Sequence, residues 1–226
     1  MTGRRELYLQ EMGLGPVWRL KPAAAEPPSP LDIQSMDSAE LEAVVANCTA
    51  CVLHKTRTRT VFGVGDENAD WLFVGEAPGA EEDAQGEPFV GQAGKLLDNM
   101  LKSIGLKRGE NVYIANVLKC RPPGNRDPLP EEVARCMPYL ERQIDLIRPK
   151  LIVTLGKFAA QTLLGRDVTI ASLRGKIHAY RGIPLIVTYH PAYLLRTLQD
   201  KAKAWEDLCL ARETMQGLSS VESTII

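Results

Sequence analysis

The sequence predicts an α/β fold of three layers, α/β/α, around a mostly parallel sheet of about four strands. Two observations lead to this prediction. The chain has four short, continuously apolar runs, and these runs alternate with longer segments whose apolar residues recur at helical spacing. Such runs are typical of strands buried on both faces, as in a parallel sheet covered by helices. The ordinary hydrophobic share of 45% in 226 residues excludes a chain that is disordered throughout.

The predicted elements can be placed from spacing and from capping or breaking residues. Asp37 or Ser38 is a suitable cap for a first helix that runs toward Asn47, and Gly105 ends a later one. The predicted helices cover residues 38–47, 91–104, 131–147, a short stretch through 161–164, and 193–215. The predicted strands are the apolar runs 71–74, 112–115, 151–155 and 185–188.

Composition divides the chain into three parts. Residues 1–30 form an N-terminal arm and a linker, because residues 21–30 read KPAAAEPPSP and are dominated by proline and alanine. Residues 31–216 carry all the predicted strands and form the folded domain. Residues 217–226 are expected to be a flexible tail.

The charge balance restricts the possible partners. With 27 basic and 28 acidic residues the net charge is −1, so a nucleic-acid site would have to be a local basic patch. No apolar run approaches the roughly 18 residues that span a bilayer. The N-terminal residues 1–6 lead into no apolar signal segment, so secretion is not expected. We expect a cytoplasmic protein that does not bind membranes, and a monomer.

The ends of the predicted strands carry the residues best suited to chemistry. They lead into the segments 75–79, 116, 156–157 and 189–191. In an open parallel sheet, ligands bind at the carboxyl ends of the strands, so these segments are expected to meet in one crevice.

The cysteines favour a metal site. Cys48 and Cys51 form a C-x-x-C pair, and Cys120 and Cys136 are the other two candidates. Four thiolates fit either tetrahedral zinc or a [4Fe–4S] cluster. Zinc ribbons use two short knuckles, so the wide second spacing favours iron–sulfur and leaves zinc as the lesser alternative. Cys209 stands in an apolar helical context and is interpreted as a small core residue.

A phosphate-binding loop is the first alternative for the glycine-rich segments, and it fails in detail. Gly94-Lys95 is followed by Leu96, so the hydroxyl that would hold magnesium is missing. Instead, the segments GEAPGAEED (75–83), GEPFVGQAGKLLD (86–98), NVLKCRPPGNRDP (116–128) and TYHPAYLLR (188–196), together with the four cysteines, resemble family 4 uracil-DNA glycosylases. These are bacterial and archaeal iron–sulfur DNA repair enzymes. The resemblance covers roughly residues 45–212.

The resemblance implies a fold, a reaction and a cofactor. The fold would be that of the uracil-DNA glycosylases, with a [4Fe–4S] cluster on Cys48, Cys51, Cys120 and Cys136. Uracil would be flipped out of single- or double-stranded DNA and hydrolysed from its sugar, which leaves free uracil and an abasic site. Such an enzyme would work in the bacterial cytoplasm, with the nucleoid.

The resemblance also implies roles for residues of the crevice. Phe89 would stack on the flipped base, and the amide of Asn116 would pair with uracil N3–H and O4. His190 would donate to uracil O2, and Glu76 would lie beside the attacking water, with Glu81, Glu82 or Asp83 as alternatives. The substrate pocket as a whole would comprise Gly75, Glu76, Ala77, Gly79, Phe89, Asn116 and His190.

Local basic clusters are the candidates for contacts with DNA. The residues expected to meet phosphates are Lys55, Arg57, Arg59, Arg121 and Arg196. Leu194 or Leu195 would fill the gap left by the flipped base.

Two other functions remain open from the sequence. A related protein could trap uracil-DNA covalently through a histidine on an inserted basic loop, but no such insertion stands between Asn125 and Pro138. A metal-stabilised module could also bind nucleic acid without catalysis.

Overall fold

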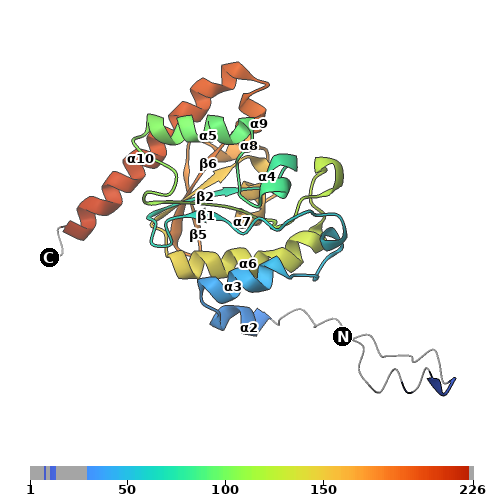
Figure 1. The fold of residues 1–226 in the computed structure, drawn as a ribbon. Coiled ribbons are helices and arrows are strands. Elements are labelled where there is room, and N and C mark those ends of the chain that lie inside the picture. Colours follow the sequence, from blue (N-terminus) through green and yellow to red (C-terminus); the bar gives the residue numbers. More distant parts are fainter. Residues whose placement is uncertain (1–7, 9–10, 14–29, 224–226) are drawn as a thin grey trace.

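The computed structural model describes residues 8, 11–13 and 30–223. In this part of the chain six strands form one sheet in the order β1-β3-β2-β4-β6-β5 (Figure 1). The strands are β1 (Val64–Gly65), β2 (Trp71–Gly75), β3 (Val112–Asn116), β4 (Leu151–Leu155), β5 (Ile177–Tyr180) and β6 (Ile183–Thr188). The four inner strands β3, β2, β4 and β6 are parallel, which confirms the predicted sheet.

The two edge strands are antiparallel additions that the sequence analysis missed. β1 pairs with β3, and β5 pairs with β6. β1 has only two residues, and β5 alternates exposed and half-buried positions, so neither shows the continuous apolar pattern of the inner strands.

Helices cover both faces of the sheet, as predicted (Figure 1). Neighbouring residues of β2 point to opposite cores: Leu72 and Val74 belong to one buried cluster, and Trp71 and Phe73 to the other. The first cluster includes residues of α3 (Ser38–Ala46), α6 (Pro130–Ile147) and α7 (Lys157–Leu164), and the second includes residues of α5 (Gln92–Ser103) and α10 (Lys201–Ser223). The remaining elements are α2 (Pro30–Ser35), η1 (Val52–Lys55), α4 (Ala80–Gln85), η2 (Pro123–Asn125), α8 (Ile170–Leu173), α9 (Pro191–Leu194) and η3 (Leu198–Asp200).

The predicted caps of the first helix are largely correct. Asp37 is the N-cap of α3: its carboxylate accepts from the backbone N–H of Glu40 (2.8 Å), and Glu40 accepts in turn from the N–H of Asp37 (3.0 Å). Such a reciprocal pair satisfies two amides that a helix start leaves without partners.

The C-terminal part differs from the prediction in two ways. The single helix expected over 193–215 is divided into α9, η3 and α10, and the Tyr193 hydroxyl donates to Asp200 (2.6 Å) across the division. α10 continues to Ser223, so 217–223 are helical where the sequence predicted a flexible tail. The arm and linker of 1–30 and residues 224–226 fall almost entirely outside the described residues. Among the described residues, no helix is both long and apolar enough to cross a membrane.

A buried ion pair anchors α10 near the end of β6. Asp207 on α10 accepts from the Arg174 side chain (2.9 Å) and from the N–H of Gly175 (3.2 Å). The Arg174 guanidinium also stands over the ring of Tyr189, 5.1 Å from its centroid. α10 is thus tied to the segment in which β6 ends.

Replacing Asp207 by alanine is expected to destabilise the fold by about 3 kcal/mol, because it leaves the buried Arg174 charge uncompensated. Glu206 is a matched control, since it lies 3.7 Å from the same guanidinium but is 73% exposed, whereas Asp207 is fully buried. Glu206→Ala should cost less than about 1 kcal/mol. Urea unfolding of both variants measures the difference, and equal losses would contradict the buried pair.

Candidate functional site

The carboxyl ends of β2, β3 and β6 border a cavity of about 410 Å³. This is the crevice predicted from the strand ends. The cavity brings together predicted residues that are far apart in the sequence, namely Glu76, Ala77, Gly79, Phe89, Asn116 and His190. Gly75 is not among the lining residues, and it stands opposite Asn116 in the sheet register. Arg126 and Tyr193 also line the cavity, and the sequence analysis gave them no role there although both stand inside the motifs.

The side chains of Asn116 and Phe89 occupy the space next to Gly75 that a side chain at this position would need. A Cβ atom at this position would overlap with Asn116 Oδ1 and would stand 2.6 Å from Phe89 Cζ. A glycine therefore permits the amide and the ring to approach the strand end together.

Asn116 ends β3 with an unused hydrogen-bond acceptor. The residue is 2% exposed, and no group in the described part of the chain donates to its Oδ1. A buried acceptor without a donor costs about 1–3 kcal/mol. A ligand in the cavity that brings an N–H group would recover this energy.

Phe89 lies beside His190. The centroids of the two rings are 5.6 Å apart, and the planes are tilted by 31°. Phe89 is buried and has a φ angle of 55°, which is uncommon for a bulky residue. The ring, the amide and the imidazole thus border the same cavity.

His190 follows β6 and is the N-cap of α9. Its Nδ1 accepts a hydrogen bond from the backbone N–H of Ala192 (3.1 Å). Since Nδ1 accepts, the proton of the neutral ring is on Nε2, which is then a donor. Burial, with a further effect of Arg196, lowers the pKa of His190 to about 4, so the ring is neutral at pH 7.

Glu76 is a half-buried carboxylate that lines the crevice. Its backbone is fixed because Leu118 donates to its carbonyl (3.0 Å). Burial raises the pKa of Glu76, and Asp127 raises it further. A carboxyl with a raised pKa and access to a cavity is a candidate for proton transfer.

The acidic alternatives to Glu76 have other partners. Asp83 is buried and accepts from the N–H groups of Thr58 (2.9 Å) and Arg59 (3.4 Å). Glu82 also lines the cavity, and its carboxylate accepts from the N–H groups of Val90 (3.1 Å) and Gly91 (3.3 Å). Glu81 is exposed and does not line the cavity.

The predicted DNA contacts are only partly available at the surface. Lys55, Arg59 and Arg196 are exposed, and Arg121 is half-buried with its Nε donating to Asn125 (2.7 Å). Arg57 differs from the prediction: its guanidinium donates to the sulfur of Cys120 (3.1 Å) and to the carbonyl of Ala46 (3.4 Å).

The structure also corrects the candidate for the apolar wedge. Leu194 is 1% exposed and packs in the core between the sheet, α5 and α10, whereas Leu195 is 42% exposed. Leu195 is thus the leucine of this pair that can reach a ligand.

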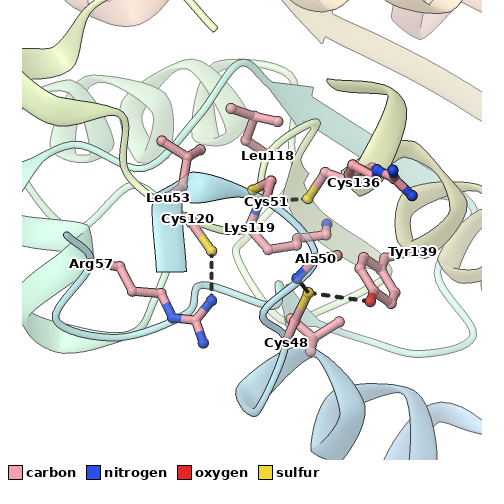
Figure 2. Close-up of a pocket in the computed structure, with 12 residues that line it drawn as sticks. Cys48, Ala50, Cys51, Leu53, Arg57, Leu118, Lys119, Cys120, Cys136 and Tyr139 are labelled. Atoms are coloured by element: carbon pink, nitrogen blue, oxygen red, sulfur yellow. Dashed lines mark hydrogen bonds between the residues drawn. The ribbon is translucent and has the colours of Figure 1, made fainter. Parts of the chain in front are cut away.

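The four predicted cysteines line a second, small cavity (Figure 2). Cys48 and Cys51 follow α3, Cys120 follows β3, and Cys136 lies on α6. Cys209 is not among the lining residues, and it is half-buried rather than a full core residue.

Hydrogen-bond donors surround the sulfur atoms of this cavity, as Figure 2 shows. Tyr139 donates its hydroxyl to Cys48 (3.3 Å), Arg57 donates to Cys120, and the backbone N–H of Lys119 donates to Cys136 (3.2 Å). Burial raises the pKa of Cys136 to about 12. Thiolates in this cavity would therefore need a cation, and the donors are placed to stabilise them.

The chemistry of the donor set is that of a thiolate-bound metal site. Within the described residues, no group of three His, Cys, Asp or Glu side chains is placed to hold a metal ion. Four thiolates are the ligands of tetrahedral zinc and also of a [4Fe–4S] cluster, so the four cysteines that line the cavity suit either group.

Several known proteins similar to this chain are uracil-DNA glycosylases. The model of the uracil DNA glycosylase superfamily matches residues 62–209. A type-4 uracil-DNA glycosylase from Archaeoglobus fulgidus is 52% identical over 171 residues, which are 72% of this chain and 84% of the relative. One from Thermotoga maritima is 48% identical over 70% of this chain and 83% of its own length. A third type-4 uracil-DNA glycosylase, from Pyrobaculum aerophilum, is 42% identical over 77% of this chain and 93% of its own length.

NMR titration is expected to show His190 as a neutral Nε2–H tautomer down to about pH 4, well below its ordinary pKa of 6.5. Arg196→Gln should raise this pKa, because the variant removes a positive charge that opposes protonation. A wild-type midpoint near 6.5 would contradict the burial and hydrogen bonding described for the ring.

Proposed function

The chain belongs to the uracil-DNA glycosylase superfamily and is a uracil-DNA glycosylase of the type-4 kind, and we propose how its residues excise uracil. The observation that carries the proposal is the meeting of Asn116, Phe89 and His190 at one cavity, with a buried Asn116 oxygen that has no donor.

The flipped base is recognised by its edge and by its face. Asn116 Oδ1 accepts from uracil N3–H, and the amide nitrogen donates to O4. Cytosine presents an acceptor at N3 and a donor at the neighbouring position, so it would leave the buried oxygen without a partner. Phe89 supplies the stacking surface, and Gly75, Ala77 and Gly79 leave room for the ring.

The bond that breaks joins C1′ of the sugar to N1 of uracil. Its electron pair leaves with the base, so negative charge develops on uracil and positive charge on the sugar. The Nε2–H of His190 donates to uracil O2 and stabilises that charge. A neutral imidazole with a fixed tautomer can act as this donor over the whole physiological pH range.

Water completes the reaction at C1′. The ionised carboxylate of Glu76 orients the water and accepts its proton as the C1′–O bond forms. Burial raises the pKa of Glu76, and in its ionised form such a carboxylate is a better base than an exposed one. The products are free uracil and an abasic site.

We also propose a [4Fe–4S] cluster on Cys48, Cys51, Cys120 and Cys136. When bound, it supplies a cross-link that joins the segment after α3 to β3 and α6. In the chain itself, Tyr139 on α6 donates to Cys48, and Arg57 of the loop donates to Cys120, so two hydrogen bonds already tie the loop between α3 and β1 to the rest of the domain. The presence of the four cysteines around one cavity and the donors aimed at Cys48 and Cys120 support this assignment.

DNA binding is proposed for basic residues near the surface, of which Arg196 lines the crevice. Exposed Lys55, Arg59 and Arg196, with Arg121, would contact phosphates, and Leu195 would enter the stack. The same proposal includes uracil in single- or double-stranded DNA as the substrate. It also includes a monomer that works in the bacterial cytoplasm, with the nucleoid.

The proposal is tested by incubating the protein with a uracil-containing oligonucleotide and a thymine control, followed by alkaline cleavage. Only the uracil strand should break. His190→Ala should lower the single-turnover rate by about 10²–10³-fold, as expected for one lost donor, and Asn116→Ala should also lower it strongly.

His178→Ala is the matched control, because His178 lies on β5 and binds the carbonyl of Leu173 (2.7 Å), away from the crevice. It should keep the wild-type rate. A DNA adduct that survives a denaturing gel would instead support covalent trapping, and an intact uracil strand would support a binding module.

Metal analysis tests the cluster separately. The purified protein should be brown and contain about four iron atoms per chain. Cys136→Ser should lower the iron content and the visible absorbance, whereas Cys209→Ser should retain both because Cys209 lies outside the cavity. A colourless wild-type protein with one zinc ion would reject the cluster.

A further inference from the structure

The loop that carries Phe89 has an energetically unfavourable backbone conformation at this residue. Phe89 has a φ angle of 55° in the segment between α4 and α5. A bulky residue in this left-handed region is sterically disfavoured, and it persists only where the surroundings hold it. The contacts around Phe89 should therefore include groups that fix the loop.

Arg108 provides one such group from outside the crevice. It lies in the loop between α5 and β3, and it donates to two successive carbonyls, those of Pro88 (2.9 Å) and Phe89 (2.8 Å). Its Nε donates to Asp98 on α5 (2.9 Å), which fixes the guanidinium in turn. Two parallel N–H donors on a planar group suit such a pair of carbonyls, and lysine cannot supply them.

Glu82 holds the same loop on the following side. Its carboxylate accepts from two successive amides, those of Val90 (3.1 Å) and Gly91 (3.3 Å). The start of α5 also lies close, because a Cβ atom on Gly94 would overlap with the carbonyl of Phe89. Four consecutive residues, 88–91, are thus held by two side chains of opposite charge.

We propose that Arg108 is a positioning residue for uracil excision, which sets the Phe89 ring beside Gly75 and His190 by holding the carbonyls of residues 88 and 89. Arg108 does not line the crevice, so its effect passes through Phe89. The inference rests on the proposed function, in which Phe89 stacks on uracil. A ring that leaves this position would either intrude on the space above Gly75 or lose its contact with the base.

The test combines Arg108→Gln, Arg108→Lys, Phe89→Ala and the double variant Arg108→Gln/Phe89→Ala. The matched control is Arg181→Gln, since Arg181 forms a comparable ion pair with Asp145 (3.1 Å) on the distant β5–β6 hairpin. Three quantities are measured for each holoprotein: the single-turnover rate, inhibition by free uracil, and the thermal midpoint. Inhibition by free uracil measures the affinity of the base pocket. A general loss of stability would not weaken this inhibition as long as the protein stays folded.

Arg108→Gln should weaken uracil inhibition and the rate by about tenfold, the scale of one base–aromatic stack. Arg108→Lys should not restore them, and Arg181→Gln should leave both unchanged. In the double variant the two losses should not add, because both remove the same stacking surface.

Three results would overturn the role of Arg108: unchanged uracil inhibition in Arg108→Gln, full recovery with lysine, or additive losses in the double variant. If Phe89→Ala itself leaves the rate and the uracil inhibition unchanged, the stacking role in the proposed function fails instead. If Phe89→Ala is impaired and Arg108→Gln is not, the stacking role stands and only the positioning role is rejected.

Discussion

The close approach at Gly75 is the constraint on which the crevice depends. The parallel register places Gly75 opposite Asn116, and the absence of a side chain lets Phe89 reach the same point. A second glycine has a similar role at the end of β4, where a Cβ atom on Gly156 would stand 2.9 Å from the Cβ of His190. Asn116 at the end of β3, Phe89 before α5 and His190 after β6 can approach one another because Gly75 and Gly156 have no side chains. The rigid sheet fixes their positions before any ligand arrives, which is how an enzyme offers preorganised dipoles to a developing charge.

The cysteine cavity and the crevice are linked through one buried cation. Lys119 is almost fully buried, and its ammonium donates to the carbonyl of Asn116 (2.9 Å) and to the side chain of Gln143 (2.6 Å). Its backbone N–H donates to Cys136, and Cys120 follows it in the chain. Burial lowers the pKa of Lys119 to about 8, and the neighbouring cysteines oppose that effect. A single residue thus helps to fix the end of β3 beneath the crevice and the wall of the cysteine cavity, so a loss of order in one would reach the other.

The sequence predicted those features that depend on continuous patterns. The four parallel strands, the helices on both faces and the crevice follow from apolar runs and strand ends, and Asp37 correctly predicted the start of α3. Features that depend on tertiary contacts were not predictable. Leu194 and Leu195 are neighbours of the same type, and only the packing of α9 on the core decides which is exposed. The contacts of Arg108 could not be predicted from a sequence motif. Its partners Pro88 and Phe89 lie about twenty residues earlier, and they accept through backbone carbonyls, which every residue has.

Arg57 illustrates the same limit for charge. In the sequence it belongs to a basic cluster, but its guanidinium faces the sulfur of Cys120 and a helix carbonyl. Two further arginines have partners within the protein: Arg108 donates to loop carbonyls, and Arg174 pairs with Asp207. The exposed basic residues that are free to meet phosphates are therefore fewer than the basic composition suggests, and Lys55, Arg59 and Arg196 are among them. Under the proposed function, few phosphate contacts would give only weak, salt-sensitive binding to ordinary DNA, and the buried amide and the stacked ring would supply most of the preference for a strand that contains uracil.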